Sequence, residues 1–144
     1  MPSLRSVLLV DDCDAELELM THYLEPWKSQ VRIETLRHGG EAIDFVARRG
    51  AFASRGPGEP SLMVIDNRMP VVGGIEAVQQ IRTAPAMRFV PIVMWSGSVD
   101  PGDLRRAYDA GVTSYLQKPS TAAQEQEMLH ATLHYWLRLH CAPD

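Results

Sequence analysis

The sequence is poor in cysteine, has no excess of basic residues and lacks a long hydrophobic run. Cys13 and Cys141 are its only cysteines, too few and too far apart for a disulfide framework or a zinc site. A reducing cytoplasm is the simplest compartment for such a chain. The apolar run 7–10 stops at Asp11, so it is too short for a signal peptide or a membrane span.

The charge balance excludes one class of partner. The net charge is −4, whereas general nucleic-acid binding needs a basic face that displaces the counterions of the phosphates. With 144 residues, 45% of them hydrophobic, the chain has the size and composition of one globular domain. We expect a single domain over 1–144 with its core at about 4–139, and no separate output domain, because only a helix and a short tail follow Lys118.

Short apolar runs alternate with helical patterns along the chain. Apolar runs without clean alternation are typical of strands that a parallel sheet buries on both faces. The predicted strands are 7–10, 31–36, 62–65, 90–95 and 114–116, the second of them at an edge. The predicted helices are 15–24, 40–49, 75–81, 103–110 and 121–139, with Ser120 as the N-cap of the last and Gly111 as the C-cap of the fourth. The segment 50–61 is rich in glycine and proline and is predicted to be a linker.

This order predicts an α/β fold with a doubly wound parallel sheet. For five consecutive βα units we favour the flavodoxin-like strand order 2-1-3-4-5. Ligands of such folds bind beyond the carboxyl ends of the strands. The polar residues directly after each strand should therefore decide the function.

Charged and hydroxyl side chains stand at these predicted strand ends. Asp11 and Asp12 follow the first strand, Asp66 ends the third, Ser96 the fourth, and Lys118 follows the fifth. Each alone has an ordinary structural explanation as a helix cap, a turn residue or a solvated surface charge. Their coincidence at one edge of the sheet favours a functional site.

Clustered carboxylates repel one another and therefore favour a bound hard cation. Oxygen ligands and water indicate Mg²⁺ in an octahedral shell. The predicted ligands are Asp12 and Asp66 directly, Asp11 through water, and the backbone carbonyl of Arg68.

The same residues suit phosphoryl transfer. A carboxylate oxygen of Asp66 can act as the nucleophile for in-line attack on a phosphoryl group. Lys118 would pair first with Asp66 and later with a phosphoryl oxygen. Ser96 would donate a hydrogen bond to another phosphoryl oxygen.

Several motifs carry a family resemblance: Asp11–Asp12, the run Asp66-Asn67-Arg68-Met69-Pro70 with Gly74, Ser96, and Lys118–Pro119. With these motifs the chain resembles the receiver domain of two-component response regulators over nearly its whole length. The resemblance implies a stand-alone regulator, not an enzyme, that is phosphorylated on Asp66 by a sensor histidine kinase or a small phosphodonor. It also makes Lys118–Pro119 a candidate for a cis peptide bond.

The resemblance implies a readout as well. Ser96 would move toward the phosphoryl group and Tyr115 would turn inward behind it, so that the fourth helix, fifth strand and fifth helix present a changed face. The runs Arg106-Ala107-Tyr108, Ser114-Tyr115-Leu116 and Tyr135-Trp136 are similar to those of small regulators partnered with bacterial phytochromes. A bacteriophytochrome is therefore a possible sensor kinase for this chain.

The last predicted helix carries two apolar stripes. Leu129, Leu133, Trp136 and Leu137 form one, and Met128, Thr132, Tyr135 and Leu139 form the other. One domain can bury the first stripe against its sheet. The second stripe is either a wide core face or an exposed patch that mediates a homodimer.

Two further functions compete with the phosphoacceptor. A phosphorylation-independent interaction module on the same fold would have no need of the acidic residues, Ser96 and Lys118 together. A phosphatase of the haloacid-dehalogenase type also uses an Asp at a strand end, but it needs a second Asp two residues later, where this chain has Arg68. A nucleotide-binding loop is excluded because Gly39–Gly40 lacks the Lys and Ser/Thr that should follow.

Overall fold

The structure, a computed structural model, describes residues 5–143, so residue 4 of the predicted core lies outside it. Its centre is one parallel sheet of five strands in the order β2-β1-β3-β4-β5. The strands are β1 (Arg5–Val10), β2 (Val31–Leu36), β3 (Leu62–Asp66), β4 (Ile92–Ser96) and β5 (Ser114–Gln117). The flavodoxin-like fold class and the strand order predicted from the sequence are confirmed.

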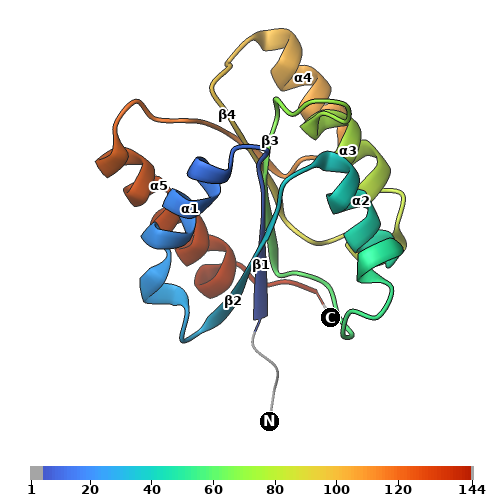
Figure 1. Cartoon of the computed structure of the whole chain (residues 1–144). Helices are drawn as coiled ribbons and strands as arrows, with labels where there is room; N and C mark the ends of the chain where they lie inside the picture. The colour runs from blue at the N-terminus through green and yellow to red at the C-terminus, as the bar shows by residue number, and fades with distance from the viewer. Residues whose placement is uncertain (1–4, 144) are drawn as a thin grey trace.

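Helices cover both faces of this sheet (Figure 1). They are α1 (Asp14–Tyr23), α2 (Gly39–Ala47), α3 (Gly74–Ile81), α4 (Pro101–Ala110) and α5 (Ala122–His134). Helices α1 and α5 lie on one face, and α2, α3 and α4 on the other. Within 5–143, no helix combines the length and the apolar character that crossing a bilayer requires.

The two faces are held by separate apolar clusters. Leu8, Ile65 and Met94 point from the sheet toward α2, α3 and α4. Their sequence neighbours Leu9 and Val64 point to the opposite face, toward α1 and α5. Since successive side chains of a strand alternate between faces, burial on both sides explains the unbroken apolar runs.

Several predicted boundaries were wrong by one or a few residues. Strand β4 begins at Ile92, because Pro91 has no N–H for the ladder and contributes only its carbonyl, which accepts from Met63. The N-cap of α5 is Thr121 instead of Ser120, and its hydroxyl accepts from the backbone N–H of Gln124. The last helix changes at Tyr135 to one turn of π-helix that ends at Leu139. Gly111 is the C-cap of α4 as predicted, in the left-handed region with φ 115°.

The predicted linker 50–61 does not separate domains but connects α2 to β3. Two arginines hold it in place. Arg48 donates to the carbonyl oxygens of Arg55 and Gly56, at 2.8 and 2.9 Å. Arg55 donates to the carbonyl oxygen of Phe45 at 2.7 Å and pairs with Glu59 at 2.9 Å. The glycines and prolines here therefore shape an ordered connection.

Candidate functional site

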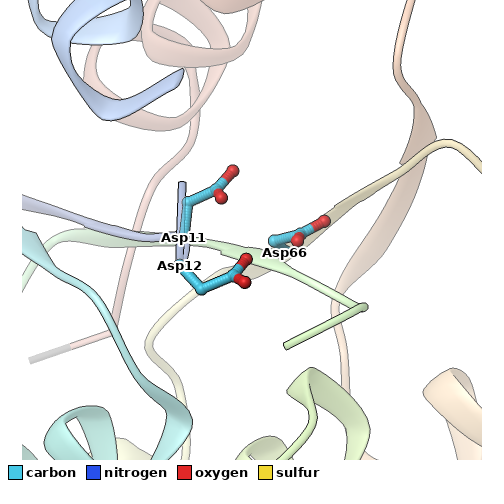
Figure 2. Close-up of side chains that lie close together, drawn as sticks. All are labelled: Asp11, Asp12 and Asp66. Atoms are coloured by element: carbon cyan, nitrogen blue, oxygen red, sulfur yellow. The ribbon is translucent and has the colours of Figure 1, made fainter. Parts of the chain in front are cut away.

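Three carboxylates meet at the carboxyl edge of the sheet. Asp11 and Asp12 follow β1, and Asp66 is the last residue of the neighbouring strand β3. One oxygen from each lies within 4.8 Å of the other two, and Figure 2 shows the three side chains gathered at these strand ends. Asp11 and Asp66 are buried, whereas Asp12 is exposed.

Backbone contacts fix the positions of the two buried carboxylates. The N–H of Asp11 continues the ladder by donating to Leu36, and the side chain of Asp11 accepts from the N–H of Cys13 at 2.9 Å. At the end of β3, Gly74 lies so close that a Cβ there would be 2.2 Å from the carbonyl oxygen of Asp66. Only glycine fits at the start of α3 without moving the backbone of Asp66.

Lys118 is the cation of the cluster. Its ammonium nitrogen lies 3.1 Å from a carboxylate oxygen of Asp66 and 3.6 Å from one of Asp11. The backbone N–H of Lys118 donates to the carbonyl of Ser96 at 2.7 Å, which ties the residue to the end of β4. The prediction of a cis Lys118–Pro119 bond is wrong: the bond is trans, the isomer that an X–Pro amide favours by about 0.5–1 kcal/mol.

The electrostatics of the site favour a further cation. Burial raises the pKa of the Asp66 carboxyl and the charge of Asp12 adds to this, while Lys118 and the backbone N–H of Arg68 lower it without cancelling the rise. Burial likewise raises the pKa of Asp11, against the hydrogen bond from Cys13. One ammonium thus leaves the carboxylates undercompensated.

Lys118 experiences the opposite balance. Burial disfavours its charged form, but the negative charges of Asp66 and Asp11 outweigh burial and raise the pKa of its ammonium. Lys118 is therefore a permanent cation at neutral pH. It holds Asp66 by charge and hydrogen bond.

The three carboxylates fit a divalent metal ion. Two oxygens on opposite sides of Mg²⁺, each about 2.1 Å from the ion, are about 4.2 Å apart. The three carboxylate oxygens lie within 4.8 Å of one another, which is close to this separation. A water molecule between one carboxylate and the ion would account for the difference. An all-oxygen donor set with excess negative charge suits Mg²⁺ better than softer metals.

The predicted hydroxyl and aromatic residues flank the same edge. Ser96 is fully buried at the end of β4, and its hydroxyl accepts from the backbone N–H of Ser98 at 3.1 Å. Tyr115 is half-buried on β5, and its hydroxyl donates to the carbonyl of Ser98 at 2.8 Å. Both predicted switch residues therefore contact the same residue of the β4–α4 loop.

The β3–α3 loop contains a strained residue. Val71 has φ 67°, in the left-handed region, and its side chain is fully exposed. Left-handed backbone is unfavourable for a β-branched residue. Arg68 and Val71 line a hollow of about 460 Å³ between this loop and α4.

Sequence reasoning missed a second acidic pair beside Lys118. Burial and the neighbouring carboxyl of Glu16 raise the pKa of Glu125 to about 7, with a further contribution from the charge of Asp11. Glu16 lies on α1 and Glu125 on α5. Neither residue belongs to a local motif, and only the packing of α1 on α5 brings them together, so no sequence signal was available.

Other notable residues have simple positions. Cys13 is exposed and is the N-cap residue of α1, without a side-chain capping bond. Trp95 is buried next to Ser96, and its indole N–H has no hydrogen-bond partner among the described residues.

Comparison with known proteins identifies the family. Residues 7–131 match the family described as "Response regulator receiver domain". The chain belongs to the receiver domain family. This receiver domain is 33% identical to the "Probable methanogenesis regulatory protein FilR2" of Methanothrix harundinacea over 95% of this chain and 86% of that protein.

Solved structures agree with this assignment. The phosphorylated cyanobacterial phytochrome response regulator RcpA superposes with a TM-score of 0.90 at 25% identity, covering 99% of this chain and 100% of that one. The receiver domain of the sensor histidine kinase PA1611 from Pseudomonas aeruginosa, with a magnesium ion in its active site cleft, gives a TM-score of 0.69 at 25% identity, covering 90% and 97%. The predicted resemblance to receiver domains, and to the small phytochrome regulators among them, is confirmed.

Proposed function

We propose that this receiver domain accepts a phosphoryl group on Asp66 from a sensor histidine kinase. The observation that carries the proposal is the contact of 3.1 Å between the Lys118 ammonium and the Asp66 carboxylate, beside two further carboxylates. A half-buried lysine that holds one carboxylate in an acidic cluster suits a nucleophile that becomes more negatively charged on modification.

The transfer requires little covalent chemistry from the protein. An oxygen of Asp66 attacks phosphorus in line with the leaving group. The O–P bond forms as the P–N bond of the kinase phosphohistidine breaks, and the departing imidazole nitrogen takes up a proton. Lys118 neutralises part of the charge on the phosphoryl oxygens, and the hydroxyl of Ser96 donates to another of them.

Mg²⁺ is the proposed cofactor. Asp12 and Asp66 would bind it directly, Asp11 through water, and the backbone carbonyl of Arg68 would complete the protein ligands. When bound, the ion neutralises charge on the phosphoryl group. The excess negative charge of the cluster supports this assignment, and the related PA1611 receiver domain holds magnesium in its cleft.

We propose that α4, β5 and α5 form the face that reads out phosphorylation. Ser96 and Tyr115 both bond to Ser98, so a movement of Ser96 toward the phosphoryl group alters the partner of Tyr115. Tyr108, whose hydroxyl accepts from the backbone N–H of Tyr115, and Val99 of the β4–α4 loop are both exposed and complete the apolar part of this face.

The kinase partner is proposed to be a bacteriophytochrome in the cytoplasm. The similarity to the phytochrome response regulator RcpA supports the first part, and two free cysteines support a reducing compartment. In this proposal residues 1–144 form a single receiver domain, and the full coverage of the RcpA chain supports that organisation.

A homodimer through the end of the last helix is part of the proposal. The first apolar stripe is in the core, with Leu129, Leu133 and Leu137 buried. In the second stripe Thr132 is buried, but Tyr135 and Leu139 are 49% and 60% exposed. A mass corresponding only to monomer in light scattering at high concentration, with and without phosphodonor, would exclude this dimer.

The central test is phosphorylation in solution. The protein is incubated with acetyl phosphate and Mg²⁺, and its intact mass is measured. We expect one added phosphoryl group that is stable in acid and labile in base, and no addition to Asp66→Asn.

A matched control is Asp44→Asn, which changes a half-exposed carboxylate on α2 that pairs with Arg49 and does not belong to the acidic cluster. It should gain the phosphoryl group as the wild type does. If the wild type gains no mass while its fold is intact by circular dichroism, the phosphorylation-independent interaction module becomes the better explanation.

A further inference from the structure

Ser98 is bonded to three different elements of the proposed switch. Its N–H donates to the hydroxyl of Ser96, and its carbonyl accepts from the hydroxyl of Tyr115. Its own hydroxyl donates to a carboxylate oxygen of Asp103 in the first turn of α4, at 3.0 Å. A single small residue therefore joins the end of β4, the aromatic residue of β5 and the start of α4.

The contacts of Ser98 extend into the cap of α4. The hydroxyl of Ser98 also accepts from the N–H of Asp100, at 3.2 Å. The side chain of Asp100 in turn accepts from the N–H of Asp103, at 3.1 Å, which makes Asp100 the N-cap. The helix start is thus held both by its own cap and by the hydroxyl of Ser98.

Asp103 lies between two partners. One carboxylate oxygen accepts from Ser98, and the other is paired with Arg106. Asp103 is mostly buried, with its side chain 19% exposed, whereas that of Arg106 is 62% exposed. Asp103 and Arg106 both line the hollow between the β3–α3 loop and α4, together with Arg68 and Glu76.

We propose that Ser98 is a positioning residue that couples the orientation of the Ser96 hydroxyl to the first turn of α4 through its own hydroxyl. The inference deepens the proposed function and rests on it for its biological role. A Ser96 hydroxyl that turns toward a phosphoryl oxygen turns its lone pairs away from the N–H of Ser98. Ser98 then shifts and its bond to Asp103 weakens, which loosens the first turn of α4.

The test is a double-mutant cycle read by amide hydrogen exchange and mass spectrometry, in the full chain without phosphodonor. Ser96→Ala removes the acceptor for the Ser98 N–H, and Ser98→Ala removes the hydroxyl bonded to Asp103. We expect each to accelerate exchange in residues 99–106 about five-fold, the effect of one net hydrogen bond. The double variant should exchange no faster than either single variant, because the two residues act in series.

Ser98→Thr keeps the hydroxyl and should restore wild-type exchange, whereas the matched control Ser29→Ala, an exposed serine in the α1–β2 connection, should have no effect. Additive effects of Ser96→Ala and Ser98→Ala would overturn the proposal, because they would mean that Ser98 merely stabilises α4. The proposal is also overturned if Ser98→Ala leaves the exchange of residues 99–106 unchanged.

A second arm separates this inference from the proposed function. After incubation with acetyl phosphate and Mg²⁺, Ser98→Ala should gain one phosphoryl group but lose the change in exchange of 99–106 that the wild type undergoes. If the wild type gains no phosphoryl group, the proposed function fails while the double-mutant cycle still decides the coupling. If only Ser98→Ala fails to gain it, Ser98 belongs to the transfer step and its assignment as a readout residue is wrong.

Discussion

The ammonium nitrogen of Lys118 lies 3.1 Å from a carboxylate oxygen of Asp66, although β4 separates the strands that lead to these two residues. The lysine reaches across the end of β4, where its own N–H is bonded to Ser96. The long side chain of Lys118 thus spans the end of β4 and places one positive charge among the three carboxylates. The stability of this edge of the sheet therefore depends on that charge.

Replacing the lysine should destabilise the protein in a Mg²⁺-dependent manner. Lys118→Met leaves Asp11 and Asp66 buried without their cation. We expect a loss of about 2 kcal/mol in the free energy of unfolding, less than the about 3–5 kcal/mol of a fully buried pair, because the lysine is partly exposed. Urea denaturation with EDTA measures the loss, which should shrink when Mg²⁺ replaces the missing charge. Lys28→Met, at an exposed pair with Glu25, is the control and should change stability little.

Mg²⁺ itself should stabilise the wild type. A ligand that binds only the folded state adds about 2.7 kcal/mol at 100 times its dissociation constant. Thermal unfolding at increasing Mg²⁺ concentration should show a rising midpoint, and the rise should be much smaller for Asp12→Asn. Asp14→Asn changes a nearby exposed carboxylate that pairs with Arg37 outside the cluster, and it should keep the full response. Equal responses of the two variants would contradict the assignment of Asp12 as a ligand.

The close approach of α3 to β3 predicts a severe effect of a single methyl group. In Gly74→Ala the new Cβ would lie 2.2 Å from the carbonyl oxygen of Asp66, so the backbone must move. We expect destabilisation at the upper end of the about 1–3 kcal/mol typical of overpacking, together with slower phosphorylation of Asp66. Gly40→Ala is the control, because a Cβ there meets nothing within 4 Å and the helix should gain stability. Chemical denaturation of both variants distinguishes the steric clash at residue 74 from the general effect of alanine on helix propensity.

The acidic pair beside Lys118 predicts a pH dependence of stability. The pKa of Glu125 is raised to about 7 in the folded protein, above that of an unfolded glutamate. Its contribution to stability is therefore complete below about pH 4.3 and is lost as the pH rises through about 7. Because the residue is only half-buried, solvent screening limits the loss to about 1 kcal/mol.

Glu125→Gln should remove this contribution to the pH dependence. The variant should be more stable than the wild type at pH 8 and similar to it at pH 5, as measured by urea denaturation across this range. Glu127→Gln, two residues further along the same helix and exposed, should follow the wild-type curve. A parallel pair of curves for the wild type and Glu125→Gln would show that Glu125 ionises freely.

The strained loop residue offers a stabilising substitution. Val71 has φ 67°, a conformation that costs a side-chain-bearing residue about 1–2 kcal/mol and glycine almost nothing. Val71→Gly should raise the free energy of unfolding by about 0.5 kcal/mol, because the relief of strain exceeds the added backbone entropy of glycine. Val99→Gly, at an exposed valine without positive φ, should instead lower it. A thermal midpoint for Val71→Gly below that of the wild type would be the contrary result.

The fold was predictable because the inner strands β1, β3 and β4 are covered on both faces. That burial requires continuous apolar runs, and a regular alternation of strands and helices admits few topologies. Asp11, Asp66 and Ser96 were predictable for the same reason, since each stands at the end of a buried run, and Lys118 follows the short strand that completes the sheet. Topology alone then brings them to one edge.

Other features depended on geometry that a linear pattern does not contain. The isomer of Lys118–Pro119 was predicted by resemblance and is wrong, because the energy difference between the isomers is small enough for context to decide. The pairing of Glu16 with Glu125 arises from the docking of two helices far apart in sequence. Ser98 makes contacts through its N–H, its carbonyl and its hydroxyl. The sequence shows that a hydroxyl is present, but it does not show the partners of the backbone groups.

The strand order has a consequence for the order in which the site assembles during synthesis. The acidic residues are synthesised with the first and third strands, but the lysine that holds Asp66 is synthesised only after the fifth. A nascent chain still attached to the ribosome therefore carries its carboxylates long before it carries their counter-charge. The balance of charge at this edge is therefore complete only when the fifth strand has joined the sheet.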